Sequence, residues 1–327
     1  MQAKYSNVSA VPLSVAVFLA SDFYDHNEDP NTISATSLIK PIRQIILTNR
    51  VNPELALIDL TQMVASRVGT AIHDGFERAW VNNHVTALTA LGFPEKIVNR
   101  VLVNPTKDTM FDGCIPVYLE QRATKQVGRW NVSGKFDFVG EGRVEDVKTT
   151  STYTAMHSTN DAKYILQGSI YRWLNPEIIT QPNMAIQFIF TDWSKAKAMA
   201  DPKYPQQRIQ QLILPLKSTQ EIQGYVERKL NQIEQYWDTP EEQIPFCTDE
   251  DLWRSEPVFK YYKNPTKTTR STKNFDTKQE AFIRLAEDGN VGIVKEVPGQ
   301  VTACKYCPAF SACSQKDALV ASGDLIL

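Results

Sequence analysis

Two carboxylates and a lysine stand at regular spacing around one short turn. The alternating segments 134–139 and 143–148 flank Gly140-Glu141-Gly142, a pattern that predicts a β-hairpin. With a two-residue turn, Asp137 lies opposite Asp146, and their side chains are about 5 Å apart on one face. Carboxylates held this close repel one another unless a divalent cation lies between them, and Mg²⁺ takes oxygen ligands of this kind.

The lysine belongs to the same face of the hairpin. Side chains alternate along a strand, so Lys148 points with Asp146 while Glu145 and Val147 point away. Carboxylate-bound Mg²⁺ lowers the pKa of a bound water and polarises a phosphoryl oxygen, and an ammonium group orients that water or offsets the developing charge. The three residues therefore predict phosphodiester hydrolysis. The alternative is a surface hairpin with solvated Asp and Lys side chains.

Helical patterns precede and follow this hairpin along the sequence. The hydroxyl of Ser37 suits a helix start, and apolar residues recur every three or four positions from Leu57 to Trp80, as in a long helix with one buried face. Residues 81–105 continue the helical pattern. Residues 218–221 form a capping box, which predicts a helix that ends near Pro240.

The remaining pattern predicts a strand-rich middle and an irregular end. Residues 241–327 show weak periodicity, and the apolar run from Val11 to Ala20 is expected to be a buried strand or helix, not a signal peptide. The expected fold is α/β, with a mixed central sheet that carries the hairpin and helices on both faces. Further elements are expected at 114–119, 185–190 and 210–214 (strands) and at 163–173 (helix).

Four sequence motifs in the chain resemble those of a known nuclease family. Asp137 with Asp146-Val147-Lys148 resembles the PD-(D/E)XK nuclease core, in its RecB-type branch. Gly69-Thr70-Ala71-Ile72-His73, followed by Glu77, looks like that branch's G-x-x-x-H helix, and Gln167-Gly168-Ser169-Ile170-Tyr171 looks like its Q-x-x-x-Y helix. The resemblance implies a restriction-endonuclease-like core and Mg²⁺- or Mn²⁺-dependent DNA hydrolysis.

The resemblance also implies roles for the added residues. His73 offers a neutral imidazole to the metal, and this nitrogen ligand favours Mn²⁺ over Mg²⁺. Glu77, one helical turn on, holds His73 or a metal-bound water. Gln167 and Tyr171, also one turn apart, contact the scissile phosphate or orient Lys148. The alternatives are a buried core histidine and ordinary helix packing with a polar rim.

The cysteines predict a second metal centre. Cys304, Cys307 and Cys313 follow a C-x₂-C-x₅-C spacing that presents three thiolates to one centre. Cys247 is the expected fourth ligand, and Cys114 is expected to be a buried apolar residue. The spacing resembles the C-terminal iron–sulfur staple of RecB-type nucleases, which implies a [4Fe–4S] cluster. A structural Zn²⁺ satisfies the same spacing.

A basic run lies between these cysteines. The segment 257–275 interleaves cations with Phe259, Tyr261 and Tyr262 and contains no acidic residue. The cations are expected to follow a phosphate backbone while the aromatic rings stack on bases, although a solvated loop is the alternative. The expected DNA-binding residues are Lys260, Lys263, Lys267, Arg270 and Lys273.

Composition limits the possible partners. The 327 residues include 35 Lys and Arg against 37 Asp and Glu, so a net charge of −2 gives no global attraction to nucleic acid. No apolar run is long enough to cross a membrane, and five clustered cysteines favour a cytoplasmic protein (host cytoplasm if phage-encoded) over a disulfide scaffold. Three regions are expected: an N-terminal helical region at 1–68, a nuclease core at 69–240 and a metal-binding, DNA-contacting lobe at 241–327.

The predicted function is that of a metal-dependent deoxyribonuclease. Exonuclease action follows from the resemblance to stand-alone bacteriophage enzymes of replication and recombination. No G-x-x-x-x-G-K-[ST] segment occurs, so a helicase, like a single-strand-annealing or single-strand-binding protein, is expected as a separate partner. Two alternatives are a catalytically silent nuclease-fold module that binds DNA ends or proteins, and a zinc-ribbon interaction protein, which accounts only for residues 247–313.

Overall fold

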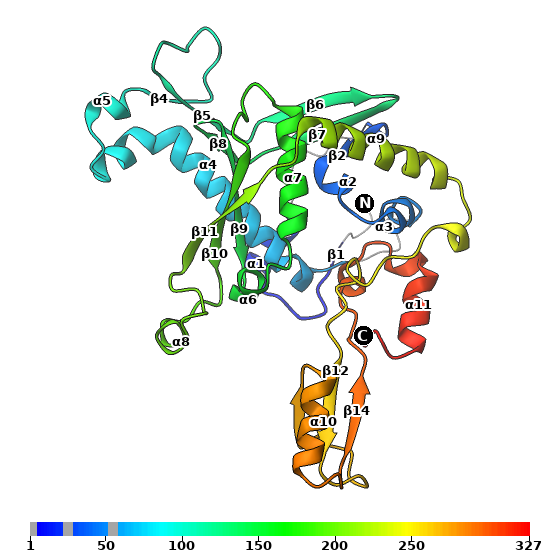
Figure 1. Ribbon diagram of the computed structural model, residues 1–327. Coiled ribbons are helices and arrows are strands. Elements are labelled where there is room, and N and C mark those ends of the chain that lie inside the picture. The colour runs from blue at the N-terminus through cyan, green and yellow to red at the C-terminus, as the bar shows by residue number, and fades with distance from the viewer. Residues whose placement is uncertain (1–4, 22–28, 52–57) are drawn as a thin grey trace. The chain divides into compact units, whose positions relative to one another are not determined.

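The computed structural model describes residues 5–21, 29–51 and 58–327 and divides into two compact units (Figure 1). Unit 1 comprises Met1–Ile39 and Ala56–Asn231, and unit 2 comprises Lys40–Leu55 and Gln232–Leu327. Within the described ranges, every helix is too short or too polar to cross a membrane.

Unit 1 is built on a six-stranded mixed sheet of order β11-β10-β9-β8-β5-β4. The β9–β10 and β4–β5 pairs are parallel, and the other three pairs are antiparallel. The mixed central sheet expected from the sequence is therefore confirmed. The strands are β4 (Val101–Val103), β5 (Ile115–Leu119), β8 (Phe138–Gly140), β9 (Arg143–Thr150), β10 (Asn183–Phe190) and β11 (Ile209–Pro215).

The predicted hairpin forms with the predicted register. Gly140 pairs with Arg143 across the two-residue turn. The turn residues Glu141 and Gly142 have φ of 49° and 78°, as a tight hairpin turn of this type requires. The last pair of the ladder is Phe138 with Glu145, so Asp137 lies just beyond the end of β8.

A second, three-stranded sheet has the order β2-β7-β6. Its strands are β2 (Thr32–Ser34), β6 (Arg122–Val127) and β7 (Trp130–Lys135). The segment 134–139, expected as one continuous strand of the hairpin, is therefore interrupted, because the chain leaves β7 and enters β8 of the other sheet across Phe136 and Asp137. The chain makes the same passage between β5 and β6 across Glu120 and Gln121. The two passages are hydrogen-bonded together, since the Glu120 N–H donates to the Asp137 carbonyl at 3.1 Å.

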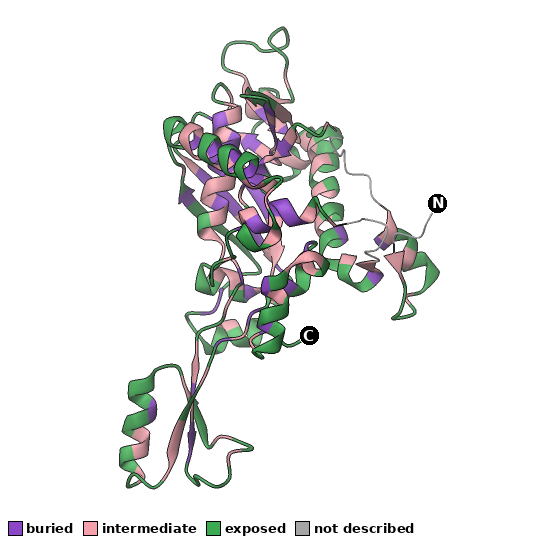
Figure 2. Cartoon of the chain, turned by 90° about the vertical axis from the view of Figure 1, so that its right-hand side faces the viewer, coloured by how far each residue is buried: buried purple, intermediate pink, exposed green. Residues whose placement is uncertain are grey.

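Helices lie on both faces of the large sheet. On one face, the N-terminal half of α4 (Val64–Ala90) approaches β9, where a Cβ at Gly69 would lie 3.8 Å from Thr149 Oγ1. On the other face, α7 (Asp161–Leu174) crosses β10, and Gly168 permits the close contact because a Cβ there would lie within 3 Å of Met184. Figure 2 shows the buried residues concentrated on the strands between these helices.

Unit 1 also contains several shorter helices and strands and the helix that the capping box begins. The capping box is present, because the Ser218 hydroxyl accepts from the Glu221 N–H and the Glu221 carboxylate accepts from the Ser218 N–H. The remaining elements are β1 (Tyr5–Ser6), α1 (Leu13–Ala20), α2 (Ala35–Leu38), β3 (Ile58–Asp59), the 3₁₀ turn η2 (Leu60–Met63), α5 (Glu95–Val98), α6 (Thr152–His157), α8 (Lys195–Ala200) and α9 (Thr219–Tyr236).

Two helix predictions need correction. The helix expected over 57–80 begins only at Val64 and runs to Ala90, so 81–105 holds the end of α4, the short helix α5 and a strand; Leu57 lies outside the described residues. The face expected to be buried is largely exposed, with Val64 45% and Phe76 42% accessible. The α1 run is helical, but Leu13 is 79% exposed, so its predicted burial is also wrong.

Unit 2 contains a small sheet and several short helices. Residues 258–297, which we call the arm, form a three-stranded antiparallel sheet of order β13-β12-β14 with helix α10, where the sequence predicted irregular structure. The elements of unit 2 are α3 (Ile42–Thr48), η3 (Glu241–Gln243), β12 (Val258–Tyr262), β13 (Lys273–Phe275), α10 (Lys278–Glu287), β14 (Ile293–Val297), η4 (Ala303–Tyr306), η5 (Phe310–Ala312) and α11 (Ser314–Ala321).

Candidate metal centre and active site

The candidate site forms where β8 stops short of the end of its partner strand. Opposite Val147 of β9 there is no residue of β8, so the backbone groups of Val147 need other partners. Asp137 supplies one, because its Oδ2 accepts from the Val147 N–H at 3.2 Å. His73 of α4 supplies the other, with Nε2 3.1 Å from the Val147 carbonyl oxygen. Side chains from α4 and from the β7–β8 passage therefore meet at this point of β9.

The imidazole of His73 faces two carboxylates. Its Nδ1 lies 3.3 Å from Asp137 Oδ2 and 3.9 Å from Glu120 Oε1. Because a carbonyl only accepts hydrogen bonds, the contact with Val147 assigns a proton to Nε2. In the neutral ring, Nδ1 then carries the lone pair and points at the carboxylates, as a metal ligand would.

His73, Glu120 and Asp137 form a set that fits a divalent metal ion. Their ligand atoms all lie within 4.8 Å of one another, and in the described ranges no other group of three His, Cys, Asp or Glu residues is this compact. One imidazole nitrogen with two carboxylate oxygens suits Mn²⁺, and the carboxylates alone suit Mg²⁺.

Glu120 is the functional candidate that sequence reasoning missed. It sits in the β5–β6 passage, where its backbone has a φ of 51°, a left-handed conformation that is uncommon for a residue other than glycine. Its Oε1 faces His73, and its Oε2 lies 2.5 Å from Lys135 Nζ. Lys135 thus holds the second oxygen, while the first faces His73. No spacing motif marks Glu120; the only available signal was its place between two strands.

Asp146 and the half-buried Lys148 form an ion pair next to this set. Lys148 Nζ lies 2.6 Å from Asp146 Oδ2, as the predicted shared face requires, and the Asp146 side chain is only 3% exposed. That oxygen is fully buried and has no hydrogen bond of good geometry. Burial raises the pKa of Asp146 to about 6, against the attraction of Lys148.

Charges within the set shift one another's pKa values. The hydrogen bond to Asp137, and then that to Glu120, raises the pKa of His73 to about 10. Burial works against ionisation of Asp137, but the hydrogen bond and charge of His73, with the charge of Lys148 and the Val147 N–H, outweigh it and lower the pKa of Asp137. Without a metal, a proton on His73 therefore balances the carboxylates.

The other expected site residues lie on the helices that carry the motifs. Glu77 is half-buried on α4 and is not a member of the compact set. Gln167 and Tyr171 form a pair on α7, in which Gln167 Nε2 donates to the Tyr171 hydroxyl at 2.8 Å. The Tyr171 ring packs against β7, where a Cβ at Gly134 would lie 3.1 Å from its Cδ1. Their roles toward phosphate or Lys148 stay predictions.

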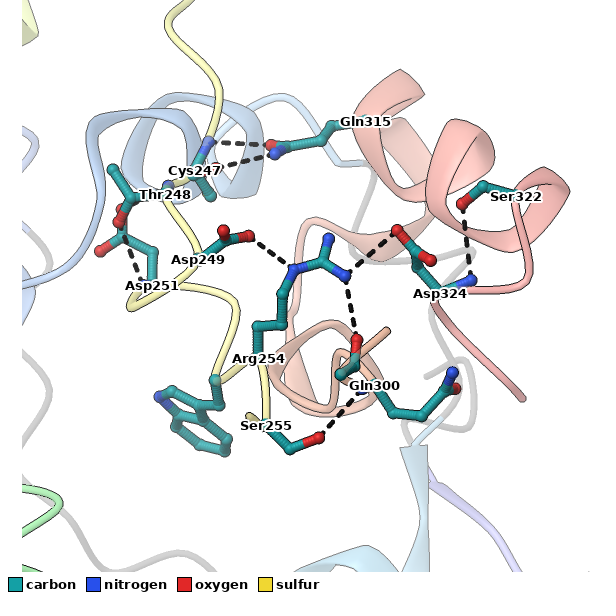
Figure 3. A network of polar contacts seen from close by, with 12 residues as sticks. Cys247, Thr248, Asp249, Asp251, Arg254, Ser255, Gln300, Gln315, Ser322 and Asp324 are labelled. Atoms are coloured by element: carbon teal, nitrogen blue, oxygen red, sulfur yellow. Dashed lines mark hydrogen bonds and ion pairs between the residues drawn. The ribbon is translucent and has the colours of Figure 1, made fainter. Parts of the chain in front are cut away.

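Cys247 is fixed to the segment that follows Cys313. The Cys247 N–H donates to Gln315 Oε1, and Gln315 Nε2 donates to the Cys247 carbonyl, each at 2.9 Å (Figure 3). In the same view, Arg254 joins Asp249 to Asp324. These bonds connect the chain around Cys247 with the last helix of unit 2.

The four cysteines of unit 2 are neighbours but not a closed ligand set. Burial raises the pKa of Cys247 to about 12, with smaller contributions from Asp251, Cys313 and Cys307, and burial raises that of Cys304 alongside the same two thiols. Among the described residues, no three of their sulfurs lie within 4.8 Å of one another, whereas one Zn²⁺ holds its thiolates about 3.8 Å apart. Cys114 precedes β5 in unit 1 and is half-buried, not buried as expected.

A buried arginine contacts this cysteine group. Arg43 is only 1% exposed, its Nε donates to Cys313 Sγ at 3.3 Å, and its Nη1 donates to the Ile244 carbonyl at 2.9 Å. It also forms an ion pair with Glu241. The cation therefore lies where thiolate charge would develop.

The aromatic residues of the basic run do not face solvent. Tyr261 is fully buried, and Phe259 and Tyr262 are 8% and 7% exposed, so the prediction that they stack on bases is wrong. Phe259 and Tyr261 lie on the face of the arm sheet that α10 covers, and Tyr262 lies on the other face. Lys260 lies on β12 and Lys273 on β13, and the connection between these strands carries Lys263, Lys267 and Arg270.

Two solved structures show distant similarity to the chain. The protein SSO0001 is 17% identical with a TM-score of 0.39, and the match covers 66% of this chain and 81% of that one. A phage-related exonuclease from Haemophilus somnus 129PT is 12% identical with a TM-score of 0.29, covering 63% of this chain and 93% of that one. No protein-family model and no curated protein matches the sequence. Similarity this weak carries no functional argument, so function must be inferred from the residues of the site.

Proposed function

We propose that the chain is a metal-dependent deoxyribonuclease that hydrolyses phosphodiester bonds at the site around Val147. One observation carries the proposal: the compact His73, Glu120 and Asp137 set, which comes from α4, the β5–β6 passage and the β7–β8 passage, lies beside the Asp146–Lys148 ion pair on β9. A structural ion pair would need neither the extra carboxylates nor an imidazole nitrogen turned toward them.

Each residue has a separate task in this proposal. His73 Nδ1, Asp137 and Asp146 hold a Mg²⁺ or Mn²⁺ ion, with Glu120 as a further ligand. When bound, this ion activates a water and stabilises charge on the phosphoryl oxygens. Lys148, kept charged by Asp146 and Asp137 despite its burial, orients the attacking water or offsets negative charge on the phosphate. Gln167 and Tyr171 position the phosphate or Lys148.

The finer assignments rest on the resemblance to RecB-type PD-(D/E)XK nucleases. They include exonuclease action and cooperation with a separate helicase or single-strand-binding or annealing protein. They also include a [4Fe–4S] cluster on Cys247, Cys304, Cys307 and Cys313, with Zn²⁺ as the alternative.

Incubation with end-labelled linear DNA and closed circular DNA tests the proposal. We expect cleavage of the linear DNA with Mn²⁺ or Mg²⁺, no cleavage with EDTA, and an intact circle if the enzyme acts from ends. Cleavage of both substrates would support nuclease activity but exclude the exonuclease assignment. DNA binding without cleavage under any metal would support the silent binding module instead.

A further inference from the structure

One face of the arm sheet carries an unbalanced pair of lysines. Strand pairing places Lys260 of β12 directly opposite Lys295 of β14, so their Cβ atoms are about 5 Å apart. Like charges in this arrangement destabilise a sheet. The ion pairs within the arm join Arg284 to Glu287 and Asp288, and in the described part of the chain neither lysine has an ion-pair partner.

This face is the one that α10 leaves open. Helix α10 packs on the opposite face, where the Tyr261 hydroxyl donates to Asp288 at 2.7 Å and Ala281 is fully buried. Figure 2 shows the helix along one side of the arm's strands. Alternation along the paired strands puts no acidic residue on the open face. Its members are Val258, Lys260, Tyr262, Asn274, Ile293, Lys295 and Val297.

Charge is also concentrated on the arm as a whole. Residues 258–297 contain eight Lys and Arg against five Asp and Glu, a net charge of +3, although the whole chain carries −2. The ring of Tyr262 lies 5.8 Å from Lys295 Nζ and is 7% exposed, so it supports that lysine and offers no surface for stacking on a base.

We propose that the open face of the arm, centred on Lys260 and Lys295, binds the phosphate backbone of nucleic acid without sequence preference. This inference rests on the proposed nuclease function for the identity of the polyanion. A line of phosphates neutralises the two facing ammonium groups, which have no acid of their own. From the sequence, this role was predicted for Lys260, Lys263, Lys267, Arg270 and Lys273. Strand pairing instead places Lys260 opposite Lys295, which lies outside the basic run.

Binding of a labelled short duplex and of the matching single strand tests this proposal. Measurements use the full chain with Asp146→Asn and no added metal, so that cleavage does not interfere. We expect the Lys260→Gln/Lys295→Gln pair to weaken binding about 10–100-fold near ~0.1 M salt and to reduce the slope of log K against log salt by about two. The control pair Lys278→Gln/Lys203→Gln removes the same charge from α10 and from an exposed loop and should have little effect.

The outcomes separate this proposal from the nuclease assignment. Equal loss in the two variant pairs would overturn it, because net charge alone would then explain binding. Binding to vesicles containing anionic lipid, with no binding to either nucleic acid, would also overturn it. If the wild-type chain cuts no DNA but the Lys260→Gln/Lys295→Gln pair still weakens binding, only the nuclease assignment is rejected. The Lys260→Gln/Lys295→Gln pair removes a like-charge repulsion, so its melting temperature should be unchanged or higher. A lower melting temperature would show misfolding, which is thereby separated from a loss of binding.

Discussion

The two candidate metal sites differ in how they are held together. The set around Val147 is assembled by backbone: two crossings between sheets and one incomplete strand ladder fix Glu120 and Asp137, and α4 adds His73. The cysteines of unit 2 lie in or next to 3₁₀ turns and loops, and two of them, Cys304 and Cys247, pack with Leu252, Val301 and Leu319 in a small apolar cluster. The first set is already compact in the structure, whereas among the described residues no three sulfurs of the second lie within 4.8 Å of one another.

This difference predicts opposite consequences of losing a metal. Unit 1 keeps its fold, because His73 takes up a proton and balances the carboxylates in place of the ion. Unit 2 loses stability, because metal binding at the proposed cysteine centre contributes directly to folding.

The largest expected effect is the loss of activity in Asp146→Asn. The substitution preserves the side-chain volume but removes the charge that is paired with Lys148 at 2.6 Å. We expect cleavage of linear DNA to fall about 10³-fold, with the circular dichroism spectrum unchanged. Activity within a few-fold of wild type would remove Asp146 from the site.

Substitution of Cys247 tests the proposed cysteine centre of unit 2. We expect Cys247→Ser to lose nearly all of the iron or zinc that the anaerobically purified chain carries, and to lower the melting temperature of unit 2, because the remaining three thiolates cannot close the centre. The matched control is Cys114→Ser in unit 1, which should retain the metal. Loss in the control instead would make Cys114 the fourth ligand.

Glu120 and Glu77 provide a matched pair for the preformed site. Glu120→Gln should weaken the apparent affinity for Mn²⁺ about 10–100-fold, because its Oε1 faces His73 and its Oε2 is held by Lys135. Glu77→Gln should change it less, since Glu77 is outside the compact set. Isothermal titration calorimetry measures both, and a stronger effect at Glu77 would restore the expectation from sequence.

The smallest expected effect is a proton released on metal binding. A pKa raised from 6.5 to about 10 means that charged His73 stabilises the metal-free fold fully below pH 6.5, and that this stabilisation is lost as the pH rises through about 10. A metal must displace this proton, so affinity for Mn²⁺ should rise with pH by up to about tenfold per unit in this range. Calorimetry in buffers of different ionisation enthalpy should detect about one proton released; none would contradict the displacement.

The sequence predicts the parts of the site that depend on local pattern. The hairpin register followed from a two-residue turn with alternating flanks, and the contact of Asp146 with Lys148 followed from strand periodicity. Glu120 was beyond reach, because its position depends on two crossings between sheets that join residues distant in sequence. The open face of the arm was missed for the same reason: strand pairing brings Lys295 opposite Lys260, although 35 positions separate them in the sequence.

Burial was predicted least well. A helical period identified α4 but not its exposed residues, since periodicity indicates an apolar face without showing what covers it. The aromatic residues next to Lys260 were assigned to base stacking, but a domain as small as the arm needs its large rings for a core.

Pulsed electron paramagnetic resonance of bound Mn²⁺ tests the central claim most directly, because it detects a nitrogen ligand on the metal itself. We expect a nitrogen coupling in the wild-type chain that disappears in His73→Gln and remains in His84→Gln, a control on the same helix whose Nδ1 lies 2.7 Å from the Trp80 carbonyl. A wild-type spectrum without nitrogen coupling, or a coupling that survives His73→Gln, would contradict the assignment of His73 and its carboxylates as the metal centre.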